Sequence, residues 1–191
     1  MAKQFIAKYA KELATKNYNQ LEILFGNKIT DDIFNTNIPC EIYKTIKDYF
    51  QKKYPEFSTQ YIENKSYFDK NMELQINNTF QQRVFKHKLF DKLFIENSEK
   101  INYQLVFSEK KMLSIENFPT KYEYGNECFT KMTSINIKNK FYLNFTEITN
   151  LQNKTFYKIS ILMKRKTNNK FSDLYLLMKE YIEQITSIFN I

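Results

Sequence analysis

Glycine, histidine and cysteine are scarce in this chain of 191 residues, and each shortage excludes a class of site. The two glycines, Gly26 and Gly125, lie far apart, so no glycine-rich loop is present to cradle a phosphate. The single histidine, His87, lies between two lysines, which argues against a His-based metal site and favours a solvated surface residue. Cys40 and Cys128 are too few for a disulfide framework or a zinc site, so we expect free thiols in a reducing compartment.

Long apolar runs are also missing from the sequence. No stretch reaches the roughly 18 residues that a membrane helix needs. The segment from Met1 to Lys11 has charges spread through it, unlike the apolar centre of a signal peptide. We therefore expect a soluble protein of the cytoplasm, or of a virion, with no membrane partner.

The composition that remains is that of a folded, basic protein. Hydrophobic residues make up 42% of the chain and aromatic residues 17%, so we expect a single domain over residues 1–191. The net charge of +8 favours RNA, DNA or an acidic protein surface as partner. A lysine-rich coding bias explains the charge equally well. The abundance of residues that A/T-rich codons encode is compatible with a viral or plasmid source.

Three segments have the apolar spacing of amphipathic helices. Residues 2–16 place apolar side chains three and four positions apart. Residues 39–54 begin at Pro39 and end before Pro55, as a proline-bounded helix does. Residues 171–189 carry a continuous apolar stripe. These segments predict one helix near each end of the chain and another after the first strand.

Between the helices, alternating polar and apolar residues predict a series of antiparallel strands. Residues 20–26 form the first, and residues 57–78 contain two more. Further strands are predicted at 101–107, 111–117, 128–138, 140–149 and 155–165. The segment 80–95 fits either a helix or short strands. The order predicts an α+β protein whose strands close into an antiparallel barrel with flanking helices.

Four of these strands contain residues at the spacing of a sequence motif, but other residues occupy several positions that are charged in the motif. The first strand has the frame Gln20, Glu22, Leu24, Phe25 and Gly26. In the last strand, alternate positions are Lys158, Ser160 and Leu162. Two inner strands have the frame Glu127, Phe129, Lys131 and Thr133 and the run Phe141–Thr146. The run Lys110–Glu116 has a basic residue, then Leu-Ser, then Glu.

The order and spacing of these frames, from about residue 18 to 165, resemble the tunnel-fold RNA 5′-triphosphatases of fungal and viral mRNA-capping enzymes. The motifs of that family read Glu-x-Glu-x-Arg-Phe-Gly, Arg-x-Lys-x-Arg-x-Ser and Phe-Arg-x-Asp-Leu-Thr. The resemblance implies a triphosphate-tunnel barrel with a hydrophilic interior. In the family, Glu residues at alternate positions of the first and last strands hold Mg²⁺ or Mn²⁺, and basic residues on other strands hold the triphosphate.

The residues of this chain depart from that pattern at the metal site. Glu22 alone cannot supply the several oxygen ligands that a hard divalent cation needs. Lys158 would repel the cation from the position the metal takes in the family. We also expect Leu24, Phe129, Tyr142 and Leu162 to point inward and fill the lumen as an ordinary packed core.

Basic residues remain as candidates for binding phosphate or RNA. Carried over by the resemblance, they are Lys111, Lys131 and Lys158. The run Lys164, Arg165 and Lys166 could grip a phosphate backbone, although a solvated hairpin end explains it as well.

The leading hypothesis is a catalytically inactive tunnel-fold protein that serves an mRNA-capping or transcription machine, with no cofactor. Its partners would be a capping enzyme, RNA polymerase subunits or RNA. An alternative is an active Mg²⁺- or Mn²⁺-dependent triphosphatase that uses Glu22 with carboxylates such as Glu63, Glu73 or Glu116. A third reading is a basic nucleic-acid-binding α+β domain of another kind.

Overall fold

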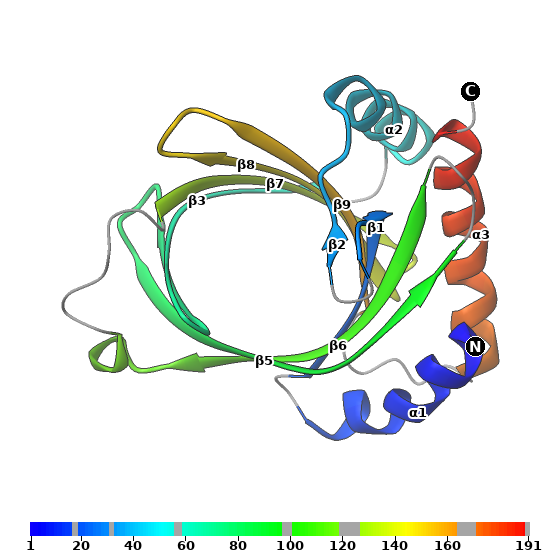
Figure 1. Cartoon of the computed structure of the whole chain (residues 1–191), viewed down its shortest axis with the longest axis horizontal. Coiled ribbons are helices and arrows are strands. Elements are labelled where there is room, and N and C mark those ends of the chain that lie inside the picture. Colours follow the sequence, from blue (N-terminus) through cyan, green and yellow to red (C-terminus); the bar gives the residue numbers. More distant parts are fainter. Residues whose placement is uncertain are drawn as a thin grey trace.

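Eight antiparallel strands hydrogen-bond into one closed ring (Figure 1). The structure, a computed structural model, describes residues 1–16, 19–30, 33–55, 59–96, 101–118, 127–163 and 171–189. In chain order the ring strands are β1 (Asn19–Lys28), β3 (Thr59–Asp69), β4 (Met72–Asn77), β5 (Gln82–Ile95), β6 (Asn102–Leu113), β7 (Glu127–Ile137), β8 (Phe141–Asn150) and β9 (Thr155–Met163). Around the ring they follow the order β1, β6, β5, β4, β3, β7, β8, β9. Pairing of β9 with β1 closes the ring.

Three helices lie outside the barrel wall, on the same side of the molecule (Figure 1). They are α1 (Ala2–Thr15), α2 (Cys40–Lys53) and α3 (Phe171–Phe189). Each presents an aromatic side chain to the wall: the ring centroids of Tyr9 and Phe107 lie 4.1 Å apart, those of Tyr43 and Phe145 5.9 Å, and those of Tyr181 and Phe141 5.1 Å. The main hydrophobic core therefore lies between the helices and the outer face of the strands.

A second, smaller cluster covers the outer wall at β3, β4 and β5. Tyr67, Leu74 and Val84 come from these three strands, and Phe118 packs on them from beyond the short 3-10 helix η1 (Ile115–Asn117). The cluster identifies the outward face of the strands that the helices do not cover.

The predicted α+β barrel with flanking helices is confirmed, and the expected helices at 2–16, 39–54 and 171–189 are α1, α2 and α3. The ambiguous segment 80–95 is the single long strand β5. The strands expected at 101–107 and 111–117 are one strand, β6, followed by η1. Among the described residues, no helix is both long enough and apolar enough to cross a membrane.

At Gly26 two segments of the chain approach each other closely. The short strand β2 (Phe34–Asn35) pairs with the end of β1, and its backbone crosses over Gly26. A Cβ atom built on Gly26 would lie 2.0 Å from the carbonyl oxygen of Asn35. That contact is with backbone, so β2 would have to move to admit any side chain.

We expect Gly26→Ala to lower the free energy of unfolding by about 1–3 kcal/mol, because overpacking forces the backbone to shift. The direction of this change in the free energy of unfolding is informative, because alanine within a strand is ordinarily more stabilising than glycine. Chemical denaturation would measure the change. Asn27→Ala, at the exposed neighbouring position, is the matched control and should change stability by no more than about 0.5 kcal/mol. A Gly26→Ala protein as stable as the wild type would contradict the close approach.

Candidate functional site

The outer contacts identify which side chains of the wall face the lumen. Phe107, Phe141 and Phe145 contact helices, so their strand neighbours face inward, because side chains alternate along a strand. Cross-strand partners share a face, so the register carries this assignment around the ring. Charged residues that face inward include Glu22, Glu73, Arg83, His87, Lys92, Lys110 and Lys158. Positive charge therefore exceeds negative charge within this group.

An ion pair lies in the lumen where the ring closes. The Nζ atom of Lys158 on β9 is 3.2 Å from Oε1 of Glu22 on β1, and both side chains are about a quarter exposed, at 26% and 24%. Next to the pair, Leu162 faces Glu22 and Ser160 faces Leu24 across the strands. Glu22, the one carboxylate that the described residues of β1 and β9 place at this closure, is therefore neutralised by a lysine from the facing strand.

A second charged cluster surrounds Glu73, whose side chain is buried although it faces inward. The carboxylate accepts hydrogen bonds at both oxygens. Oε1 lies 2.6 Å from Nε2 of Gln75 and 3.2 Å from Oγ of Ser66. Oε2 lies 2.8 Å from Nε2 of His87 and 3.1 Å from Nζ of Lys110. Since an ionised carboxylate only accepts, Nε2 of His87 carries the hydrogen in this contact.

The environment of Glu73 keeps it ionised. Burial by itself would raise the pKa of Glu73, because it penalises the charged form. The hydrogen bond from His87 and the positive charge of Lys110 act in the opposite direction, and the net effect lowers the pKa to about 2. The carboxylate thereby fixes His87 and Lys110 on the inner wall.

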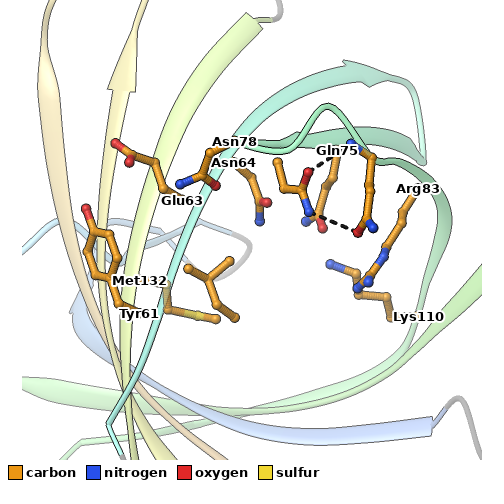
Figure 2. Close-up of a pocket in the computed structure, with 11 residues that line it drawn as sticks. Tyr61, Glu63, Asn64, Gln75, Asn78, Arg83, Lys110 and Met132 are labelled. Carbon is orange, nitrogen blue, oxygen red and sulfur yellow. Dashed lines mark hydrogen bonds between the residues drawn. The ribbon is translucent and has the colours of Figure 1, made fainter.

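A cavity of about 370 Å³ lies beside this cluster, between β3, β4, β5, β6 and β7 (Figure 2). Its walls carry the amides of Asn64, Gln75 and Asn78 together with the cationic side chains of Arg83 and Lys110. Among the described residues, Arg83 has no hydrogen-bond or ion-pair partner. A guanidinium and an ammonium with neutral amides around them suit an anion that also carries hydrogen-bonding groups.

The donor set at the ring closure does not suit Mg²⁺ or Mn²⁺, which the resemblance implies. Hard cations take several oxygen ligands, whereas Glu22 is ion-paired and its neighbours Ser160 and Leu162 add no carboxylate. Within the ranges that the structure describes, no three His, Cys, Asp or Glu side chains gather in a group that could hold a metal ion.

The basic residues expected from the sequence lie in different places. Lys158 is in the lumen. Lys131 lies on the outer wall, 52% exposed, with its Nζ 3.5 Å from Oε1 of Glu63. Lys111 is exposed on the outer face of β6, and Glu116 is exposed in η1. The run 164–166 lies outside the described residues.

Two sequence expectations about the lumen are wrong. Phe129 points outward and is 46% exposed, with the ammonium of Lys65 5.5 Å from its ring. The lumen is also not an ordinary packed core, since the main buried apolar cluster lies on the outer face of the wall. Leu24, Tyr142 and Leu162 do face inward, but each stays partly exposed, next to polar residues of the neighbouring strands.

Most of the inner cluster was not predicted from the sequence. His87 was assigned to the solvated surface, Glu73 was offered as a spare ligand, Arg83 was not singled out, and in the run Lys110–Glu116 the binding residue was taken to be Lys111. The signal was present in the alternation of Arg83, Phe85 and His87, which share one face once 82–95 is taken as a strand. That segment also fitted a helix, so the signal was lost.

The pKa of Glu73 predicts how acid affects stability. A carboxyl with a folded-state pKa of about 2 and an ordinary value of 4.5 stabilises the fold above about pH 5, and this contribution is lost between about pH 5 and 2. The contribution is about 3 kcal/mol. We expect Glu73→Gln to be less stable than the wild type at neutral pH, and the difference to shrink as the pH falls through this window. Denaturation at several pH values would test it, with Glu116→Gln as the surface control; a constant difference would contradict the assignment.

Solved structures that this fold resembles include RNA triphosphatases. The S. pombe Pct1 RNA triphosphatase aligns with a TM-score of 0.71 at 9% identity, over 99% of this chain and 85% of that one. A mimivirus capping enzyme triphosphatase aligns with a TM-score of 0.67 at 8% identity, over 100% of this chain and 97% of that one. The RNA triphosphatase domain of a trifunctional mimivirus mRNA capping enzyme gives 0.65 at 10% identity, over 97% and 95%.

Sequence comparison adds nothing to this likeness, because no protein-family model and no curated protein matches the chain. At these identities the structural agreement establishes architecture and not activity. The chain has the triphosphate-tunnel fold of fungal and viral RNA triphosphatases, with a closed barrel of eight antiparallel strands and three flanking helices.

Proposed function

We propose that this protein is a catalytically inactive relative of the RNA triphosphatases, which serves an mRNA-capping or transcription machine as a subunit or accessory factor. The ion pair between Glu22 and Lys158 is the observation that carries the proposal. Hydrolysis of a triphosphate by a tunnel-fold enzyme needs a cation to neutralise the phosphate charge and to orient water. At the ring closure of this protein, the ammonium of Lys158 already neutralises the carboxylate.

The carboxylates that an active alternative would need do not converge on Glu22. Glu63 lies on the outer wall near Lys131, and Glu116 is exposed in η1. Glu73 faces the lumen, but its oxygens are occupied by four side-chain donors. These positions support a lumen that has lost metal-dependent chemistry and kept a positively charged interior.

The proposed protein partner is a capping enzyme or an RNA polymerase subunit. RNA is proposed as a further partner. Structures with the same fold belong to a mimivirus capping enzyme and to S. pombe Pct1, which has also been solved in complex with the Spt5 CTD. The net charge of +8 suits an acidic or nucleic-acid partner. We further propose a viral or plasmid source and a cytoplasmic site of action, on the grounds of codon bias and free thiols.

The direct test is phosphate release from 5′-triphosphate RNA with Mg²⁺ or Mn²⁺. We expect the wild type to release no more phosphate than Glu22→Ala, because neither protein has a cation site at the ring closure. An active RNA triphosphatase in a parallel reaction shows that the assay works. Phosphate release by the wild type that Glu22→Ala abolishes would refute the proposal.

A second test converts the ion pair into a pair of carboxylates. Lys158→Glu removes the ammonium and places a second carboxylate beside Glu22, so we expect Mn²⁺ to raise the Tm of this variant. At a Mn²⁺ concentration ten times the dissociation constant, the stabilisation would be about 1.4 kcal/mol. Lys158→Gln, which removes the charge without adding a ligand, is the matched control. Thermal unfolding of the wild type and of this control should not respond to Mn²⁺, and a wild type that responds would contradict the ion-pair argument.

A further inference from the structure

A second pocket, of about 780 Å³, opens on the outer wall of the barrel. It lies over β4, β5 and β6, beside the turn between β3 and β4 and beside η1. Its residues on β5 and β6 alternate with His87 and Lys110, which face inward, so the pocket and the lumen lie on opposite faces of the same strands. Its volume is within the range of about 300–1,000 Å³ that ligand-binding clefts have.

Lysine side chains dominate the charge of this outer pocket. Lys86 and Lys88 come from β5 and Lys111 comes from β6, and all three are exposed. Glu109, the cross-strand partner of Lys88, is the one acidic residue among the described residues of the lining. Positive charge therefore exceeds negative charge in the outer pocket, which is the complement of an acidic partner.

Two of the lysines lie directly opposite each other. Lys86 and Lys111 are cross-strand partners, and on its other side Lys86 pairs with the uncharged Met72. Like charges directly opposite each other in an antiparallel pair destabilise a sheet. Folding alone would favour opposite charges at these two positions, whereas an acidic group bound between the lysines would offset their repulsion.

The floor of the outer pocket is apolar. Met72 and Leu113, both partly exposed, line it and pack on the smaller buried cluster of the outer wall. The side-chain amides of Asn71 and Asn117 also belong to the lining, and an amide can hydrogen-bond to the backbone of a bound peptide. None of the described lining residues is aromatic, so no ring of the lining is available for a nucleobase to stack on. The lining therefore fits a peptide better than a nucleic acid.

We propose that the outer pocket docks a segment of a partner protein that is rich in both acidic and apolar side chains. The acidic groups contact Lys86, Lys88 and Lys111, and the apolar side chains cover Met72 and Leu113. An apolar centre with a charged rim is the usual anatomy of a protein–protein interface. The membership of that partner in a capping or transcription machine rests on the proposed function, whereas the chemistry of the docked segment does not.

The test measures binding of a short, fluorescein-labelled peptide of repeated Glu-Glu-Leu-Leu units by fluorescence anisotropy, at an ionic strength of about 0.15 M. An extended chain of this sequence presents both residue types on each of its faces. We expect the wild type to bind this peptide roughly tenfold more tightly than a matched peptide of Glu-Glu-Ser-Ser units, because only leucine covers the apolar floor.

Lys86→Glu is the central variant, because it should affect stability and binding in opposite directions. It places opposite charges across from each other on β5 and β6, so we expect its Tm to rise. Its dissociation constant for the Glu-Glu-Leu-Leu peptide should rise roughly tenfold, since an attraction becomes a repulsion. Lys44→Glu is the matched control. It makes the same change in net charge at an exposed position of α2, which packs on β8 and β9, and should leave the affinity unchanged.

Three results would overturn the proposal: no binding of the Glu-Glu-Leu-Leu peptide by the wild type, equal binding of the two peptides, or equal losses of affinity in Lys86→Glu and Lys44→Glu. Binding of single-stranded RNA in place of the peptide, with dependence on Lys86, would assign the outer pocket to nucleic acid and would also overturn it. Phosphate release from 5′-triphosphate RNA would refute the inactive function while leaving the peptide result intact.

Discussion

The pairing of β1 with β9 is the contact on which the barrel depends. It joins segments from opposite ends of the chain through three register pairs, Glu22 with Leu162, Ile23 with Ile161 and Leu24 with Ser160. Ile23 and Ile161 are fully buried in the main core, so closure and helix packing stabilise one another. The same register brings Glu22 and Lys158 together inside. The geometry that closes the ring therefore also brings these two opposite charges into contact.

Elements whose period is regular could be predicted from the sequence, and irregular ones could not. The three helices have long apolar stripes, so their positions were predictable. In β5 the register with β6 shifts between Leu89 and Asp91, which moves Phe90 onto the outer face beside Phe107. That shift gives the apolar residues a spacing that resembles a helix. The motif residues chosen in β7, such as Phe129 and Lys131, face outward and not inward. Matching a strand to a motif one residue out of step exchanges its inner and outer faces.

The candidate site depends on neighbours that are distant in sequence. Glu73, His87 and Lys110 come from three consecutive positions around the ring, and nothing local in the sequence connects them. His87 lies between Lys86 and Lys88, which suggested a solvated segment. Alternation sends the two lysines outward and the histidine inward, where it meets Glu73. The positions of Glu22 and Lys158 were identified from the sequence, because motif spacing within a single strand is enough to place each of them.

The register shift in β5 has a protective consequence. Beyond Lys86 this strand pairs with β6 but no longer with β4, so within the described part of the chain its second half has a neighbouring strand on one side alone. Such edges invite a strand from another molecule. Here a β-bulge interrupts the strand, and Lys88, Asp91 and Lys92 place charges on its two faces. Bulges and charges are features that natural proteins use to discourage edge-to-edge pairing, so the irregularity that disguised the strand in the sequence also suits an open edge.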